Sequence, residues 1–457
     1  MKRTSIIFSI FLLSTLFACA KSTPLDFKAK GEAQELILLD STVVKYTAYT
    51  GIRYVTNVED SAYQTLNFFV PEGATQKSPI LLRTYVGGYM ATQAKNPSIL
   101  DATGRALAEG MCVCIPGCRG INSRKGELYS GKAPQGLLDL KAVVRYLRLN
   151  DKRMLGSAER IITDGASAGG AMSALLGATA NHPDYQPLLD KMGAAKVGDH
   201  VYASVCFCPI TDLEHADIAY EWLYMYNRPD AMSAQIVAMK FNDYINALQL
   251  RNPKDGSLLD YRNYMDYLIT YIIASAQRFV NAGGELSDSL GFEFAKYYPP
   301  TPAQRPGGPR RVPARPIITD YIIDVDMVKY LSYVASNQWL KSYPAFDNLE
   351  SPEAQLFANE YGVPCRFSRT NIDSEMQKRI RMMNPMNYIR DSKATVAQYW
   401  YIRHGALDCD TSFPIPVNLG TMLMNQGKSV DLALPWNREH SGDYNLDELF
   451  QWIHSIL

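Results

Sequence analysis

The sequence predicts an α/β protein with a mostly parallel β-sheet covered by helices on both faces and interrupted by a large helical insertion. Short apolar runs bounded by turn residues alternate with helix-like segments in the first half of the 457-residue chain and again near its end. Between residues 213 and 391 the alternation stops, and the chain becomes rich in tyrosine and helix-like. Because the alternation then resumes, we expect the insertion to interrupt one domain rather than to separate two.

The expected elements follow from local composition and periodicity. Buried strands of a parallel sheet are short runs of apolar and β-branched residues, whereas helices place apolar residues every 3.6 positions, as at Leu137, Val144 and Leu147. Predicted strands are 43–49, 64–70, 79–86, 110–116, 160–164, 202–208, 395–402 and 430–434, and predicted helices are 134–149, one near 417–425, and 446–457.

Charge and composition exclude several classes of protein. The chain has 46 Lys and Arg against 46 Asp and Glu, with no long basic run, so nucleic acid is not an expected partner. Its 47% hydrophobic content is too high for a disordered chain. Outside the N-terminus nothing approaches 18 consecutive apolar residues, so we expect no transmembrane helix in the mature protein.

The first residues have the pattern of an export signal. A basic start is followed by an apolar stretch over residues 6–17, and Leu16-Phe17-Ala18-Cys19 resembles a bacterial lipobox. We therefore expect residues 1–18 to be removed, Cys19 to be acylated, and residues 19–26 to form a tether. The alternative is ordinary signal cleavage near Ala18 or Ala20. Either way we expect the protein in the bacterial cell envelope, lipid-anchored at the outer membrane or periplasmic.

Cysteines and prolines give weaker signals. Cys112, Cys114, Cys206 and Cys208 lie in apolar runs, which predicts buried free thiols, and no C-x2-C pair supports a zinc site. We expect no metal and no cofactor.

Residues 299–316 hold seven prolines and four arginines. The prolines exclude a helix or a central strand, and we favour a spacer over a basic loop that faces a substrate.

A candidate nucleophile lies in a G-x-S-x-G segment at residues 165–169. A predicted strand precedes it and a helix of small residues follows, and such a sharp turn needs glycines around the serine to expose its hydroxyl. Ser167 is therefore the predicted nucleophile, the alternative being an idle serine at a glycine-rich helix start. The N–H of Ala168 and an N–H of Gly87 or Gly88 are the candidate oxyanion donors.

A serine needs a base and an acid that orients the base, and in this architecture they follow in the order acid, then histidine. Of six histidines, only His440 lies on a polar loop after a late strand; His404 ends the preceding strand, and His454 lies inside the last helix. The acid should follow that preceding strand, where Asp408 and Asp410 both occur. Spacing alone does not choose between these two aspartates.

Several segments together resemble the bacterial tannase (tannin acylhydrolase) family of α/β-hydrolases. The most specific are H-G-x-x-D-x-D-T-S at residues 404–412 and P-W followed by H-S-G-D-Y within residues 435–444. Residues 86–90, 164–177 and 209–217 also match, so the resemblance extends over nearly the whole mature chain.

The resemblance implies an α/β-hydrolase core over residues 27–212 and 392–457, with a lid over residues 213–391. It implies that Asp408 is the triad acid and that Asp410 contacts phenolic hydroxyls of the acyl group. Lys341 and Glu353 from the lid, with Glu350 as the alternative to Glu353, would contact the same hydroxyls. Cys409 stands where the family pattern has arginine.

The implied function is a serine esterase acting on gallate or related phenolic acid esters, with a small phenolic ester as its partner. A clamp of charged side chains suits this task, because a site built to bind a hydroxyl rejects analogues that lack it. The alternatives are a feruloyl-type or general carboxylesterase, a peptidase, or an envelope binding protein that kept the fold without turnover.

Overall fold

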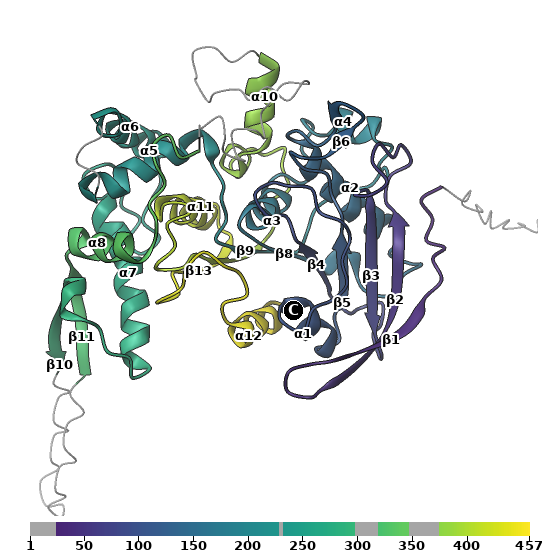
Figure 1. Cartoon of the computed structure of the whole chain (residues 1–457), viewed down its shortest axis with the longest axis horizontal. Helices are drawn as coiled ribbons and strands as arrows, with labels where there is room; N and C mark the ends of the chain where they lie inside the picture. The colour runs from purple at the N-terminus through teal and green to yellow at the C-terminus, as the bar shows by residue number, and fades with distance from the viewer. Residues whose placement is uncertain (1–23, 228–231, 298–318, 347–373) are drawn as a thin grey trace, which may run out of the picture.

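A nine-stranded sheet in the order β1-β2-β3-β5-β4-β8-β9-β12-β13 forms the centre of the structure (Figure 1). The structure is a computed structural model that describes residues 24–227, 232–297, 319–346 and 374–457. From β5 to β13 neighbouring strands are parallel, while β1, β2 and β3 add an antiparallel edge. The strands are β1 (Glu32–Ile37), β2 (Val43–Arg53), β3 (Thr65–Pro71), β4 (Ile80–Thr84), β5 (Cys112–Pro116), β8 (Ile161–Ala166), β9 (Ala203–Phe207), β12 (Tyr399–Arg403) and β13 (Ser429–Ala433). The predicted α/β fold class is confirmed.

Successive residues of the central strands enter opposite faces of the sheet, as the period of two requires. Ile161 packs with α2 (Gln135–Leu149), α3 (Ala168–Ala178) and α11 (Pro414–Asn425), whereas Ile162 packs with α1 (Ala102–Ala108) and α12 (Leu446–Ile456). The central strands are therefore buried on both faces, which is why they appear in the sequence as continuous apolar runs.

The register of the parallel strands aligns their carboxyl ends. Ala166 pairs with Phe207, Phe207 with Arg403, and Arg403 with Ala433. The residues that follow these strands therefore leave the sheet at one edge, where ligands of parallel α/β sheets bind.

The insertion contains helices and one hairpin, and within the described residues it contributes no strand to the nine-stranded sheet. Its helices are α5 (Leu213–Tyr224), α6 (Met232–Leu248), α7 (Tyr264–Asn281), α8 (Met327–Asn337) and α10 (Ser374–Met382), which lie beside the sheet domain in Figure 1. The antiparallel strands β10 (Phe292–Tyr297) and β11 (Thr319–Val325) were not expected there. The sequence did not reveal this hairpin within the helical insertion, because the alternation in Phe292-Glu293-Phe294 is too short to stand out among tyrosine-rich helices.

Three further details complete the comparison with the sequence. The predicted strand 395–402 begins later in the structure, at Tyr399 of β12, and Thr395 forms an isolated bridge with Ala180 before it. The strand β1 and the helix α1 were not predicted, nor was the short β6–β7 hairpin (Arg124–Lys125 and Leu128–Tyr129). The helix α4 (Gln186–Lys191), which is also short, was not predicted either.

The proline-rich residues 299–316, Cys19, Glu350 and Glu353 lie outside the described residues. The predicted domain boundaries stay predictions.

Six cysteines lie in the described residues, and all six are free and buried, as expected for strand and loop thiols: Cys112, Cys114, Cys118, Cys206, Cys208 and Cys409. Burial raises the pKa of Cys112 to about 12, so its thiol stays protonated at neutral pH. None of the helices in the described part of the chain is long and apolar enough to span a bilayer.

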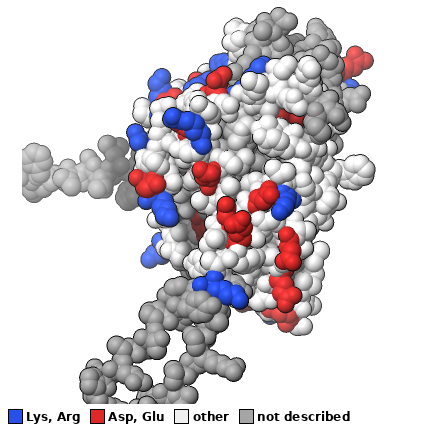
Figure 2. All heavy atoms as spheres, turned by 90° about the vertical axis from the view of Figure 1, so that its left-hand side faces the viewer, with Lys and Arg blue, Asp and Glu red and all other residues white. Residues whose placement is uncertain are grey.

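Figure 2 shows the side of the molecule on which the insertion lies. Basic and acidic side chains are interspersed over a mostly uncharged surface on this face. Trp339, in the segment of the insertion after α8, is an apolar side chain that is 96% exposed.

Candidate active site

Ser167 occupies the sharp turn between β8 and α3. Its backbone angles are φ 59° and ψ −126°, a strained conformation for a residue other than glycine. The Ser167 N–H donates to the Phe207 carbonyl at 3.0 Å, and the Ser167 carbonyl accepts from Ala171 at 3.0 Å in the first turn of α3. The serine is thus held at the carboxyl edge of the sheet with its side chain partly exposed, as a strand–turn–helix nucleophile requires.

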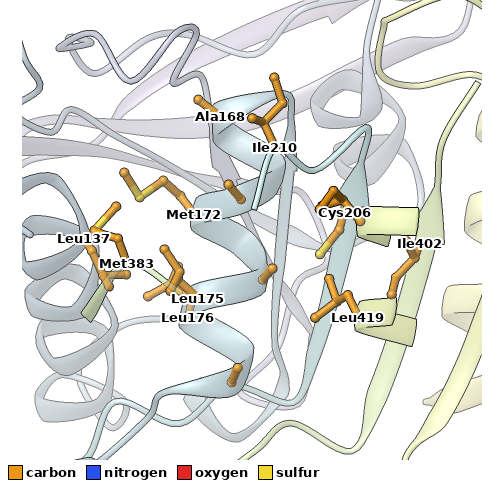
Figure 3. Close-up of a cluster of buried hydrophobic side chains, with 14 of the residues drawn as sticks. Leu137, Ala168, Met172, Leu175, Leu176, Cys206, Ile210, Met383, Ile402 and Leu419 are labelled. Carbon is orange, nitrogen blue, oxygen red and sulfur yellow. The ribbon is translucent and has the colours of Figure 1, made fainter. Parts of the chain in front are cut away.

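The glycines around the serine are explained by close backbone contacts. A Cβ on Gly165 would lie 2.4 Å from the Gly169 carbonyl oxygen, and one on Gly170 would lie 2.5 Å from the Phe207 carbonyl oxygen. Only hydrogen fits at these positions, so α3 can start directly against the ends of the strands. Figure 3 shows α3 behind this turn, with Ala168 at its first turn near Ile210 and Met172 and Leu175 further along among buried side chains. The predicted need for glycines here is confirmed.

Asp408 and His440 form a hydrogen-bonded pair. His440 Nδ1 lies 2.9 Å from Asp408 Oδ2, and the other carboxylate oxygen accepts the N–H of Asp410 at 2.8 Å. Asp408 is fully buried, whereas the Asp410 side chain is 45% exposed. Spacing in the sequence could not choose between the two aspartates, but the structure can. Only Asp408 has a buried carboxylate that is hydrogen-bonded to His440.

The charges of the pair support each other. Burial disfavours a charged carboxylate, but the imidazoles of His404 and His440 outweigh it and lower the pKa of Asp408 to about 2. Burial likewise disfavours the imidazolium, but the hydrogen bond and charge of Asp408 raise the pKa of His440 above its ordinary value. The aspartate is thus ionised at neutral pH and stabilises a proton on His440.

The loop that carries His440 packs against the nucleophile segment. A Cβ on Gly442 would lie 2.7 Å from the Cβ of Ala166, the residue before Ser167. Among the described residues no hydrogen bond joins the Ser167 hydroxyl to the His440 ring, and such contacts in enzymes without substrate often shorten only on binding. The predicted Ser167, Asp408 and His440 therefore belong to segments that meet at one edge of the sheet.

The loops after β12 and β13 hold each other in place. The Leu407 N–H donates to the Arg438 carbonyl at 2.9 Å, and the Ala406 N–H donates to the Pro435 carbonyl at 2.9 Å. Gly405 lets the two loops approach, because its Cβ would lie 2.1 Å from the Arg438 carbonyl oxygen. These contacts fix the acid and the histidine relative to each other.

The candidate oxyanion donors lie on two neighbouring turns. Ala168 is the first residue of α3, and residues 87–90 form a turn closed by a hydrogen bond of 2.9 Å from the Met90 N–H to the Gly87 carbonyl. Where α3 begins, a Cβ on Gly169 would lie 3.1 Å from the Val86 carbonyl oxygen, so the two turns are adjacent. Ala168 therefore lies on a turn adjacent to the turn of Gly87 and Gly88, and the partial positive charge of a helix N-terminus lies at Ala168.

Lys341 reaches this site from the insertion. Its Nζ lies 3.6 Å from Asp410 Oδ1, and Asp410 Oδ2 lies 3.7 Å from His440 Nδ1. Tyr220 on α5 positions this part of the insertion, because its hydroxyl accepts the Lys341 N–H at 3.0 Å and donates to the Cys409 carbonyl at 2.8 Å. The structure therefore brings Lys341 and Asp410 together beside the histidine.

Sequence reasoning assigned no role in the site to three residues around it: Arg83, Cys208, and His404, whose Nδ1 lies 3.3 Å from Asp408 Oδ2. Arg83 on β4 binds both Asp164 and Asp443, and its only signal was a lone charge inside an apolar run. Cys208 follows β9, and its sulfur lies 2.5 Å from the Tyr444 hydroxyl, a contact for which the sequence holds no signal.

Two groups of side chains hold ligand atoms close enough for a metal ion. They are Cys208, His404 and Asp408, and Asp408, Asp410 and His440, with all ligand atoms of each group within 4.8 Å of one another. Asp408 belongs to both groups, so an ion in either would compete with His440 for the carboxylate.

Ser167, on a strand–turn–helix elbow, and the Asp408–His440 pair lie on segments that meet at the carboxyl edge of a mostly parallel sheet. This arrangement places the chain among the α/β-hydrolases. A protein-family model described as BD-FAE matches residues 66–254. A search of curated proteins finds no match.

Solved structures define the family. A tannase from Fusobacterium nucleatum is 32% identical with a TM-score of 0.81, and the match covers 94% of this chain and 99% of that chain. A tannin acyl hydrolase from Lactobacillus plantarum is also 32% identical with a TM-score of 0.81, covering 94% and 98%. The chain belongs to the bacterial tannase family of α/β-hydrolases and is a carboxylic ester hydrolase.

Proposed function

We propose that this protein is a serine esterase that hydrolyses galloyl or related phenolic acid esters. The observation that carries the proposal is the position of the Lys341–Asp410 pair beside the candidate base, with 3.6 Å between Lys341 and Asp410 and 3.7 Å between Asp410 and His440. An ionic pair next to the reacting centre is a clamp for phenolic hydroxyls rather than a pocket for an alkyl chain.

The proposed reaction has two steps. The Ser167 hydroxyl attacks the ester carbonyl while His440 Nε2 takes its proton, and Asp408 holds the Nδ1 side of the ring. The N–H groups of Ala168 and of Gly87 or Gly88 stabilise the oxyanion. The alcohol leaves with the proton from His440, and a water molecule, deprotonated by the same ring, then releases the phenolic acid and restores the serine.

Similar proteins support the phenolic acyl group. Tannin acyl hydrolase structures in complex with ethyl gallate and with 3,4-dihydroxybenzoate are each 31% identical to this chain with TM-scores of 0.81. A ring with adjacent hydroxyls can be held by the Asp410 carboxylate and the Lys341 ammonium, whereas a plain benzoate offers neither group a hydroxyl to bind. Glu353 is proposed as a third contact from the insertion.

A substrate panel with matched variants tests the function. We expect the protein to hydrolyse methyl gallate faster than methyl ferulate and nitrophenyl acetate. Ser167→Ala should lose all three activities. A preference for ferulate or acetate would replace the galloyl assignment with a feruloyl-type or general esterase. Ser167→Ala with wild-type turnover, or no labelling of the wild type by a fluorophosphonate, would reject a serine esterase.

The clamp has its own control. Lys341→Met should reduce kcat/KM for methyl gallate far more than for methyl benzoate. Lys329→Met removes another ion pair of the insertion, in which Lys329 Nζ lies 3.7 Å from Asp326 Oδ2. This control should leave kcat/KM unchanged for both substrates. Equal losses for gallate and benzoate in Lys341→Met would contradict the clamp.

We also propose that Cys19 anchors the mature protein to the bacterial envelope through acyl chains. The lipobox-like Leu16-Phe17-Ala18-Cys19 supports this proposal. Cells fed a labelled fatty acid should label the wild type but not Cys19→Ala, and label in the variant would contradict the assignment.

A further inference from the structure

His404 is a buried imidazole whose role the proposed reaction leaves open. It directly follows β12 and is 0% exposed, and neither of its ring nitrogens makes a well-aligned hydrogen bond within the described residues. The Phe413 ring packs edge-on against it at a centroid distance of 5.5 Å. A buried polar group without partners is unfavourable, so the nearest polar atom is informative.

The His404 ring faces the carboxylate of Asp408, the proposed triad acid. His404 Nδ1 lies 3.3 Å from Asp408 Oδ2, the same oxygen that His440 Nδ1 approaches to 2.9 Å. Two imidazoles from the ends of neighbouring strands therefore face one carboxylate oxygen. The backbone fixes this arrangement, because the His404 N–H donates to the Ala433 carbonyl at 3.2 Å and the Asp408 N–H donates to the Gly405 carbonyl at 2.9 Å.

The charge state of His404 decides what it can do. Burial lowers the pKa of His404, so the ring is neutral at neutral pH and carries one N–H. The charged and titratable groups that face it are Asp408, His440, Asp410 and the thiol of Cys208, and all of them cluster at Asp408. A neutral ring with its proton on Nδ1 would present an N–H group to Asp408. Because it carries no charge, it would not repel the proton on His440.

We propose that His404 is a positioning residue for the proposed hydrolysis: its Nδ1–H, 3.3 Å from Asp408 Oδ2, interacts electrostatically with that oxygen and holds the carboxylate at the angle that orients His440. The inference rests on the proposed function, because it assigns a role in the same triad. His404 is closed off from the surface, so it acts on the chemical step through Asp408 and leaves substrate binding alone.

Three substitutions test this role. His404→Phe keeps the ring and the packing against Phe413 but removes the donor, and kcat for methyl gallate should fall about 10- to 100-fold with KM nearly unchanged. His404→Asn places an amide N–H close to where Nδ1 lies and should recover most of that loss. His182→Phe is the matched control, because His182 is a buried imidazole 3.1 Å from Asp391 outside the site, and its loss should lower stability without lowering kcat.

The pH profile distinguishes positioning from simple support of the fold. A carboxylate that has lost one donor interacts more strongly with protonated His440, which raises the pKa of His440. The acid limb of kcat/KM should therefore move to higher pH in His404→Phe and return to its wild-type position in His404→Asn. His182→Phe should leave the limb in place. Wild-type kcat and pH profile in a folded His404→Phe, or an equally impaired His404→Asn, would overturn the proposal.

A measurement on the unaltered protein covers the case in which His404→Phe does not fold. In ¹⁵N-histidine-labelled protein, the His404 signal should show a proton on Nδ1 at neutral pH, and a proton on Nε2 instead would overturn the proposal. Failure of the proposed function gives a different result, because Ser167→Ala would then remain active while the His404 tautomer stayed as expected.

Discussion

Arg83 donates two hydrogen bonds to the carboxylate of Asp443, at 2.7 and 3.1 Å. Arg83 lies on β4, on one side of the strand β8 that leads into Ser167, whereas Asp443 follows β13, on the other side of β8. The same guanidinium binds Asp164 at 2.5 Å. Asp164 precedes Ser167 by three residues, and Asp443 follows His440 by three. One buried cation therefore joins the segment of Ser167 to the segment of His440.

Removing this cation should destabilise the fold and weaken catalysis. Arg83→Met leaves two carboxylates in a buried site without their counter-ion, which should lower the free energy of unfolding by about 3–5 kcal/mol. Urea denaturation measures this loss. In Arg105→Met, which removes a partly exposed arginine paired with Glu109 and Asp447, we expect a change of about 1 kcal/mol or less. Equal losses in the two variants would contradict the assignment.

The two aspartates of the acid loop should differ in effect. Asp408→Asn removes the charge that orients His440, and kcat should fall about 10⁴-fold for every ester tested. Asp410→Asn should act mainly on phenolic substrates, through KM and the ratio of gallate to benzoate. Steady-state kinetics on methyl gallate and methyl benzoate would show it, and a general loss of 10⁴-fold in Asp410→Asn would exchange the two roles.

The pH dependence should respond to the charges around His440 in opposite directions. The base works in its neutral form, so kcat/KM falls as pH drops through the pKa of His440. Asp410 raises this pKa and Lys341 lowers it. Asp410→Asn should therefore move the acid limb to lower pH, and Lys341→Met should move it to higher pH. Shifts of the same sign would show that these side chains do not face the base.

A methyl group at Gly405 should separate the acid loop from the base loop. The new Cβ would lie 2.1 Å from the Arg438 carbonyl oxygen, so Gly405→Ala must displace one of the loops. Since a misplacement of about 1 Å can reduce turnover about 100-fold, kcat should fall by that order.

Gly177→Ala is the matched control for Gly405→Ala. Its Cβ would lie 2.5 Å from the Ser204 hydroxyl, in the last turns of α3 and away from the site. It should lower stability by about 1–3 kcal/mol and leave kcat of the folded enzyme nearly unchanged. Thermal unfolding and kinetics on both variants would separate the two effects.

Much of the fold could be predicted because buried parallel strands are apolar at every position. The strands around Leu82, Val113, Ile162 and Val205 were identified in this way. The strand β1 was missed because it is an exposed edge strand with mixed residues, Glu32-Ala33-Gln34-Glu35, which resemble a loop or a helix surface. The hairpin β10–β11 was missed for a similar reason, because β11 also mixes charged and apolar residues.

Candidate site residues could be proposed from the sequence where chemistry dictates residue order, but not where a role depends on contacts in space. Ser167 and His440 followed from a strand–turn–helix motif and from the scarcity of histidines. Asp408 and Asp410 belong to one loop, so only the direction of each side chain distinguishes them. His404 and Arg83 contact the site because of strand order and register, which no local pattern encodes.

The neighbouring strands β9 and β12 have a consequence for how the enzyme matures. β9 ends at Phe207 and β12 starts at Tyr399, so the whole insertion must be looped out before the two can pair. The entropy lost in closing a loop grows with its length, and contacts distant in sequence form slowly. The part of the sheet up to the serine can assemble from segments close together in the chain, whereas the acid and the histidine are delivered by its last two strands. During refolding, a protected interior should therefore precede the recovery of ester hydrolysis.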